Sequence, residues 1–90
     1  MVDLISMDDL KARKHIIIDV RTSEEIAVDP IEGALHIELQ TIPSRLDELP
    51  EDTDTLMAFV CAGNIRSAQA AEYLLVRGYE NVIVLDKFSV

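Results

Sequence analysis

A single cysteine, Cys61, directly follows the uncharged apolar run of residues 56–60 and opens a short segment of mostly small residues. Gly63 and Asn64 are the residue types that most readily accept a positive φ, so the segment can curl and turn its N–H groups inward. These groups, together with the free N–H groups of a helix that follows, would form an anion-binding nest. Arg66 adds a fixed positive charge with bidentate geometry. The segment therefore predicts a loop that stabilises negative charge at the sulfur of Cys61.

A loop of this kind would lower the pKa of Cys61 and stabilise a thiolate or a persulfide anion. The same donors would also hold a phosphate or a sulfate-like group. The alternative is that Cys61 is a small apolar side chain at the end of a strand, followed by an ordinary turn. We favour the reactive cysteine, whose sulfur would emerge at the edge of the sheet, because reactivity requires a positive and partly exposed setting.

Apolar runs that are typical of strands recur along the chain and would position this loop. Residues 15–20 are mainly β-branched and do not alternate with polar residues, which indicates a strand buried on both faces. Residues 56–60 form a second apolar strand. Residues 3–5, 34–37 and 81–85 are shorter candidates. Strands that alternate with helices indicate one α/β domain with a parallel sheet, and ligands of such sheets bind outside the carboxyl ends of the strands.

Capping signals predict where the intervening helices begin. Ser6 with Asp9, and Thr22 with Glu25, have the spacing of a capping box, and the second predicts a helix over residues 23–28. Pro43 is suited to the first position of a helix that Pro50 would end. A longer amphipathic helix is expected over residues 67–77, with a glycine at 78 to terminate it.

Composition restricts the possible partners. Eight basic residues against 17 acidic ones give a formal net charge of −9. Binding to nucleic acid or to anionic membranes is therefore not expected, because both depend on neutralising phosphates with Lys and Arg. A small anionic substrate would bind only where a local positive feature overrides the overall field.

The cysteine count and the apolar runs restrict the setting. One cysteine permits no internal disulfide and no cysteine-rich metal site, and we expect no metal and no cofactor. The acidic turn of residues 51–54 is read as solvated rather than as a calcium site. The N-terminus does not have the apolar core of a signal peptide, and no apolar run is long enough for a bilayer. We expect a single domain, residues 1–90, in the cytoplasm.

Several stretches of the chain resemble the rhodanese-like domain family of sulfurtransferases, and the resemblance runs from about Leu4 to Asp86. Its active-site loop is commonly Cys-x-x-Gly-x-Arg-Ser-Ala, and the stretches here are Ile18-Asp19-Val20-Arg21 with Glu24-Glu25, Ile31-Glu32-Gly33-Ala34-Leu35-His36-Ile37, Cys61-Ala62-Gly63-Asn64-Ile65-Arg66-Ser67-Ala68, and Gly78-Tyr79-Glu80-Asn81-Val82 with Val84-Leu85.

The resemblance implies a five-stranded parallel sheet with helices on both faces and a Cys61 that carries sulfur as a persulfide. Loop amides would cradle the sulfur, and Arg66 would contact an anionic substrate or the loop backbone. Asp19 and Arg21 would support the loop as an ion pair. The substrate-binding residues implied are Ala62, Gly63, Asn64, Ile65, Arg66 and Ser67.

Two departures from the family pattern affect the expected pocket. Asn64 occupies the position usually held by glycine, which would add bulk and a donor. After Leu85 the family usually continues with a Gly-Gly pair and a further helix, whereas residues 86–90 here have another sequence. The pocket is therefore expected to be more open, or to be completed by another subunit.

Three classes of function follow. The first is a sulfurtransferase that moves sulfane sulfur from thiosulfate or a protein persulfide carrier to a thiophilic acceptor. The second is a rhodanese-like interaction or sensing module with little turnover. The third is a cysteine phosphatase, but only four residues separate Cys61 from Arg66 where phosphatases of the related type have five, so the loop is too small for a phosphoryl group.

Overall fold

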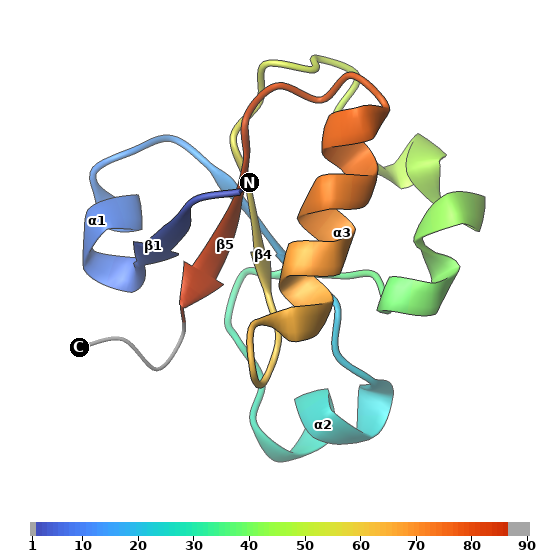
Figure 1. Cartoon of the computed structure of the whole chain (residues 1–90). Helices are drawn as coiled ribbons and strands as arrows, with labels where there is room; N and C mark the ends of the chain where they lie inside the picture. The colour runs from blue at the N-terminus through green and yellow to red at the C-terminus, as the bar shows by residue number, and fades with distance from the viewer. Residues whose placement is uncertain (1, 87–90) are drawn as a thin grey trace.

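The computed structural model describes residues 2–86 and contains a five-stranded parallel sheet, with strand order β1-β5-β4-β2-β3 (Figure 1). Each strand pairs in parallel with its neighbours, so all the carboxyl ends lie at one edge. The fold class expected from the sequence is confirmed. The strands are β1 (Leu4–Ser6), β2 (Ile16–Asp19), β3 (Leu35–His36), β4 (Met57–Val60) and β5 (Val82–Asp86).

The central strand β4 is apolar throughout because both faces of the sheet are covered. Met57 and Phe59 of β4 point into one hydrophobic cluster, and Ala58 and Val60 point into a second. This alternation follows from the two-residue period of a strand. Because neither face is solvated, the run contains no polar positions, and this is the pattern that identified it in the sequence.

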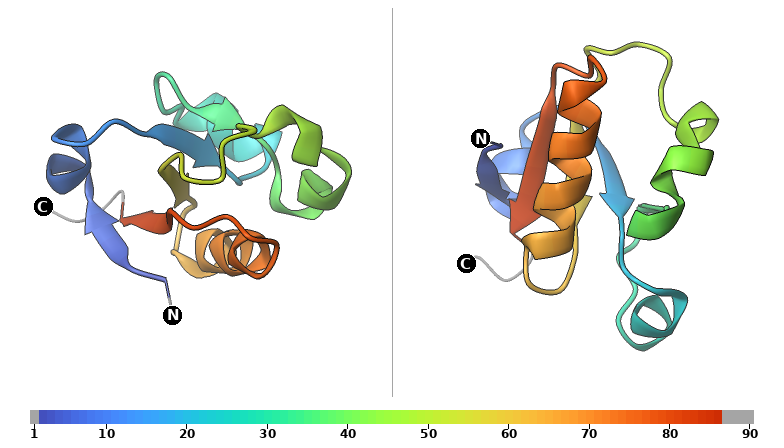
Figure 2. Two further views of the ribbon diagram at one scale, coloured as in Figure 1. Left: turned by 90° about the horizontal axis from the view of Figure 1, so that it is seen from above. Right: turned by 45° about the vertical axis from the view of Figure 1, so that its right-hand side comes forward.

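Helices cover the two faces unequally (Figure 2). On one face, α3 (Ile65–Val76) packs against β4 and β5 through Ala70, Ala71 and Leu74. On the other, α1 (Met7–Lys11) contributes the buried Leu10. The short α2 (Ser23–Val28) has no buried residue and lies at the carboxyl edge of the sheet (Figure 1).

The capping residues predicted for α1 and α2 are confirmed. The side chain of Ser6 accepts a hydrogen bond from the amide of Asp9. Thr22 and Glu25 form the complete capping box, in which each side chain bonds the other residue's backbone N–H. Both caps use only local contacts, which is why sequence spacing was sufficient to predict them.

The prediction of a helix that begins at Pro43 is wrong, both in the type of helix and in its first residue. The segment instead forms two 3-10 helices, η1 (Leu39–Ser44) and η2 (Leu46–Glu48), with Pro43 inside the first. Pro43 has no N–H to donate to the residue four positions before it, so an α-helix that includes this turn is disfavoured. Hydrogen bonds between residues three positions apart replace the α-helical pattern, such as the one from the Arg45 N–H to the Ile42 carbonyl at 3.0 Å. In this arrangement the side chain of Ile42 lies in the core.

The ends of α3 were predicted unequally well. Its start was expected at Ser67, but the helix begins at Ile65, because Asn64 acts as the N-cap and its carbonyl accepts from Ala68. At the other end, Gly78 has a φ of 98°. The N–H groups of Gly78 and Tyr79 bond the carbonyls of Leu75 and Leu74, which is the Schellman arrangement that the glycine predicted.

Within residues 2–86, no helix has the length and apolar composition to cross a membrane.

Candidate active site

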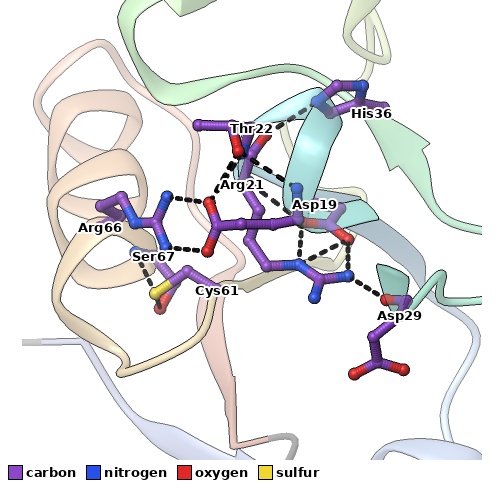
Figure 3. Close-up of polar contacts among 9 residues, drawn as sticks. Asp19, Arg21, Thr22, Asp29, His36, Cys61, Arg66 and Ser67 are labelled. Carbon is purple, nitrogen blue, oxygen red and sulfur yellow. Dashed lines mark hydrogen bonds and ion pairs between the residues drawn. The ribbon is translucent and has the colours of Figure 1, made fainter. Parts of the chain in front are cut away.

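Cys61 follows β4 directly, at the carboxyl edge of the sheet where the chain turns toward α3 (Figure 3). Its side chain continues the alternation of Met57 and Phe59 and points into the same hydrophobic cluster as they do. The residue is only 1% exposed. The expectation of a sulfur that emerges from the sheet edge is therefore wrong in this respect, because the two-residue period of the strand continues one position beyond its last ladder bond. A sulfur donor must reach this sulfur through the loop.

The sulfur of Cys61 is held by Ser67, in the first turn of α3. The amide of Ser67 donates to Sγ at 3.3 Å, and the thiol lies 3.3 Å from the hydroxyl oxygen of Ser67, to which it donates. Ser67 is itself fully buried. A hydroxyl both accepts and donates, so it can receive the thiol proton's hydrogen bond and, after ionisation, donate to the thiolate.

The pKa of the Cys61 thiol lies below its ordinary value. Burial is the largest single influence and raises this pKa, but it is outweighed by hydrogen bonds to the sulfur from the Ser67 hydroxyl and from the backbone N–H groups of Ser67, Gly63 and Arg66. All four donors stabilise the charged form, which is how a carboxylate or a thiolate at a helix N-terminus is usually favoured. The nest of N–H groups expected from the sequence thus has its counterpart in the structure.

Asn64 supplies the left-handed residue of the loop. Its φ is 68°, whereas Gly63 does not have a positive φ, so only one of the two expected residues takes this conformation. Asn64 stands where the family has glycine, and asparagine tolerates this region better than other side chains do. Its Oδ1 is buried and accepts no hydrogen bond from the described residues.

Arg66 is held by a carboxylate from another part of the chain and does not extend as a free cation. Its Nη1 and Nη2 donate to Oε1 and Oε2 of Glu25 at 2.7 and 2.8 Å. Sequence reasoning had placed Arg66 toward an anionic substrate or the loop backbone. The difference arises because α2 and the start of α3 meet at the carboxyl edge, although 41 positions separate the two residues in the chain.

Glu25 is therefore the site residue that sequence reasoning missed. It was recognised as the partner of Thr22 in the capping box and as part of the Glu24-Glu25 pair of a family motif, and neither of these gives a sign of its contact with Arg66. The pKa of Glu25 is held far below its usual range, first by the Arg66 guanidinium and then by the Thr22 amide. Glu25 stays ionised at any pH at which the protein would be assayed.

A second ion pair braces the same edge of the sheet. Arg21 Nη2 lies 2.8 Å from Asp19 Oδ2, and the side chains are 5% and 2% exposed. The guanidinium also donates to the carbonyl of Asp29, at the end of α2, at 2.7 Å. His36 Nε2 lies 2.8 Å from the Arg21 carbonyl. Asp19 and Arg21 thus tie α2 to β2 and do not reach Cys61.

The remaining loop residues form its outer surface. Ala62, Gly63 and Ile65 are exposed, and Ile65 is 72% exposed. A hollow of about 680 Å³ lies at the opposite edge of the sheet, between Arg13–Ile16, Pro50 and Asn81, away from Cys61. The described residues contain no cluster of three or more His, Cys, Asp or Glu side chains arranged for a metal ion.

Comparison with known proteins places this geometry in a family. The family model of the rhodanese-like domain matches residues 5–88. A sulfurtransferase of Allochromatium vinosum is 39% identical over 90 residues, which cover 94% of this chain and 82% of that protein. The crystal structure of a rhodanese-like domain protein from Staphylococcus aureus superposes with a TM-score of 0.79 at 34% identity, over 91% of this chain and 82% of that one.

Other matches involve only part of a longer protein. A NAD-dependent persulfide reductase from A. fulgidus has a TM-score of 0.76 at 34% identity, over 96% of this chain but 15% of that one. The chain spans 64% of a second curated relative, a putative sulfurtransferase of Bacillus subtilis, and 20% to 32% of those named tRNA uridine(34) hydroxylase. From the match over residues 5–88 and the sulfurtransferases among its relatives, this chain belongs to the rhodanese-like domain family and is of the sulfurtransferase type.

Proposed function

We propose that Cys61 carries sulfane sulfur as a persulfide, taking it from thiosulfate or from a protein persulfide carrier and passing it to a thiophilic acceptor. The observation that carries the proposal is the set of donors on one sulfur, made up of the Ser67 hydroxyl and the N–H groups of Gly63, Arg66 and Ser67. These donors lower the pKa of the thiol and so provide the nucleophile.

The first half-reaction forms the persulfide. With thiosulfate, the Cys61 thiolate attacks the outer sulfur, the S–S bond of the donor breaks, and sulfite leaves with the electron pair. The product, Cys61–S–S⁻, carries one negative charge, as the thiolate did. Loop amides that stabilise a thiolate can stabilise this anion as well, since both place charge on a sulfur in the same nest.

The second half-reaction regenerates the free Cys61 thiolate. A thiophilic acceptor such as cyanide attacks the outer sulfur, forms thiocyanate and releases the Cys61 thiolate. With a thiol acceptor, the product is the acceptor's persulfide. The reaction needs no metal or cofactor, because no external oxidant or reductant is required: in each step the nucleophile supplies the electron pair of the new bond and the leaving group takes the pair of the bond that breaks.

We also propose that this one domain is sufficient for the reaction and that it acts in a reducing compartment. The residues that act on the sulfur all lie in one domain, and we take residues 1–90 to be sufficient for the reaction. The free thiol is suited to a reducing compartment such as the cytoplasm. The match to part of a persulfide reductase supports a persulfide as one class of donor.

Intact mass spectrometry after incubation with thiosulfate tests the proposal directly. We expect the mass of one added sulfur atom, reversed by a thiol reductant or by cyanide, and absent in Cys61→Ser. The described chain has one cysteine, so the adduct can be assigned without peptide mapping. If excess thiosulfate and excess persulfide both leave the mass unchanged, the protein is not a sulfur carrier and the interaction-module hypothesis replaces this one.

A further inference from the structure

The ion pair between Arg66 and Glu25 has a consequence for which donor the site accepts. Both terminal nitrogens of Arg66 are occupied, at 2.7 and 2.8 Å, by the two oxygens of one carboxylate. The side chains are 32% and 33% exposed, so the pair lies partly within the surface. The pair uses two of the five N–H groups of the guanidinium and neutralises its charge, so Arg66 attracts a second anion less than an unpaired guanidinium would.

Glu25 is also fixed from its other side. Its Oε1 accepts from the amide of Thr22 at 3.0 Å and from the Thr22 hydroxyl at 3.1 Å. These bonds belong to the capping box of α2, and they hold the carboxylate in place independently of Arg66. The carboxylate therefore cannot swing away at no cost when an anion approaches the loop.

The charges around the loop are balanced as a result. Arg66 is matched by Glu25, and Arg21, the other guanidinium at this edge, is matched by Asp19. What remains at the sulfur is the set of N–H dipoles and the Ser67 hydroxyl. Dipoles of this kind can hold one negative charge in a small nest, but a dianion also experiences the carboxylate of Glu25 and the net charge of −9.

We propose that Glu25 determines donor specificity: by neutralising Arg66 it disfavours dianionic donors such as thiosulfate and favours persulfides, which carry at most one negative charge and react as R–S–SH. In that reaction the Cys61 thiolate attacks the outer sulfur, the donor S–S bond breaks, the proton stays on the transferred sulfur, and RS⁻ leaves. The inference rests on the proposed sulfur-carrier function of Cys61. Glu25 acts through Arg66 and does not touch the sulfur.

The test is the rate at which Cys61 gains sulfur in a single turnover, followed by intact mass, with thiosulfate and with the persulfide of 2-mercaptoethanol. Glu25→Gln retains an oxygen for the Thr22 amide, since glutamine also serves in a capping box. The substitution removes the charge that neutralises Arg66. We expect the second-order rate constant with thiosulfate to rise about tenfold, as for one charge-assisted hydrogen bond gained, and that with the persulfide to change less than about twofold.

Glu24→Gln is the matched control. Glu24 is the preceding residue of α2, is exposed, and is not the carboxylate that pairs with Arg66, yet its substitution changes the net charge equally. We expect it to leave both rate constants within about twofold of the parent. Arg66→Gln should shift selectivity the opposite way, because Glu25 then stands uncompensated and repels thiosulfate most.

The ratio of the two rate constants is measured on one preparation, so it does not depend on the fraction of a variant that is folded. An equal rise in Glu24→Gln would show that only overall charge matters and would overturn the proposal. So would a fall with both donors in Glu25→Gln, since the pair would then only position the loop. If Glu25→Gln does not fold, an unchanged ratio in Arg66→Gln decides against the proposal. Failure of the parent protein to gain sulfur from either donor would instead refute the sulfur-carrier function itself.

Discussion

At the scale of single residues, the reactivity of Cys61 is decided by a balance between burial and hydrogen bonding. The side chain is 1% exposed, which by itself favours the neutral thiol. The hydroxyl and amide of Ser67 and the amides of Gly63 and Arg66 reverse the outcome and lower the pKa. Ser67 makes two of these contacts, one through its side chain, and so its hydroxyl can be removed while the backbone donors remain.

We predict that Ser67→Ala raises the pKa of Cys61. In the parent, hydrogen bonds to the sulfur hold the pKa of Cys61 below its ordinary value, so the thiolate is formed as pH rises through that lower pKa and persists above it. The rate of sulfur loading should follow the same curve, and in Ser67→Ala both curves should move to higher pH. Ultraviolet absorbance of the thiolate during a pH titration measures the pKa, and mass spectrometry measures the rate of sulfur loading at each pH.

The control for this titration is Ser44→Ala, which removes an exposed hydroxyl bonded only to the nearby Thr41 carbonyl. Its titration should match that of the parent. A Ser67→Ala titration that also matches the parent would mean that the backbone amides alone hold the thiolate.

At the scale of elements, the start of α3 combines a local strain with an unsatisfied polar atom. Asn64 begins the helix in the left-handed region, with a φ of 68°, and its side chain makes no capping hydrogen bond. Its Oδ1 is buried without a donor among the described residues. An unpaired buried acceptor destabilises a protein by about 1–3 kcal/mol, and glycine would remove it without straining the backbone.

We predict that Asn64→Gly unfolds at equal or higher urea concentration than the parent, with a gain of up to about 1 kcal/mol after the greater chain entropy of glycine is subtracted. Asn64→Ala should be less stable than Asn64→Gly by about 1–2 kcal/mol, because both substitutions remove the unpaired oxygen but only alanine places a Cβ in the left-handed region. Equilibrium urea unfolding gives both values.

Gly33→Ala provides a reference for the loss of stability expected from a Cβ in the left-handed region, as in Asn64→Ala. Gly33 has a φ of 80°, and nothing lies within 4 Å of the position that a Cβ would take, so the substitution introduces backbone strain alone. A cost for Asn64→Ala far above that of Gly33→Ala would indicate that the asparagine side chain contributes contacts of its own. A marked loss in Asn64→Gly would contradict the assignment of Oδ1 as an unsatisfied atom.

At the scale of the whole molecule, net charge opposes the reaction that the loop favours. The chain carries a net charge of −9, and the two cations at the carboxyl edge, Arg21 and Arg66, are both paired. A dianionic donor therefore approaches against the overall field, and mobile ions screen this repulsion over about 10 Å at 0.1 M salt.

We predict that the rate constant for sulfur loading from thiosulfate rises by at least about twofold between low and moderate ionic strength, whereas loading from a persulfide, which carries at most one negative charge, changes less. The measurement uses the parent protein in a series of salt concentrations at fixed pH. A second series with a different inert salt separates screening from competition by a particular anion. A rate with thiosulfate that falls as salt is added in both series would show a net attractive field at the loop.

Several features were predictable from the sequence because their physical basis is local. Strand β4 and the sharp turn after it follow from an apolar run next to Gly63 and Asn64. The caps at Ser6 and Thr22 follow from residue types three positions apart. The family and its five-stranded parallel sheet were identified from motifs that lie in order along the chain, and the match over residues 5–88 confirms the family. The residues expected after Leu85 fall mostly outside the described part of the chain.

Only the tertiary structure decided which charges meet. Arg66 finds Glu25 41 positions away because α2 and α3 begin at the same edge of the sheet, and no spacing rule connects them. Cys61 is buried because the core face of β4 extends one residue past the ladder, and Pro43 lies within a 3-10 helix because the segment must still direct Ile42 into the core. Sequence by itself determined the local turns, the caps and the place of Cys61 directly after β4, since these depend on neighbours a few residues apart. The electrostatic character of the site depends on side chains that the parallel sheet brings together from distant segments, and therefore on the fold.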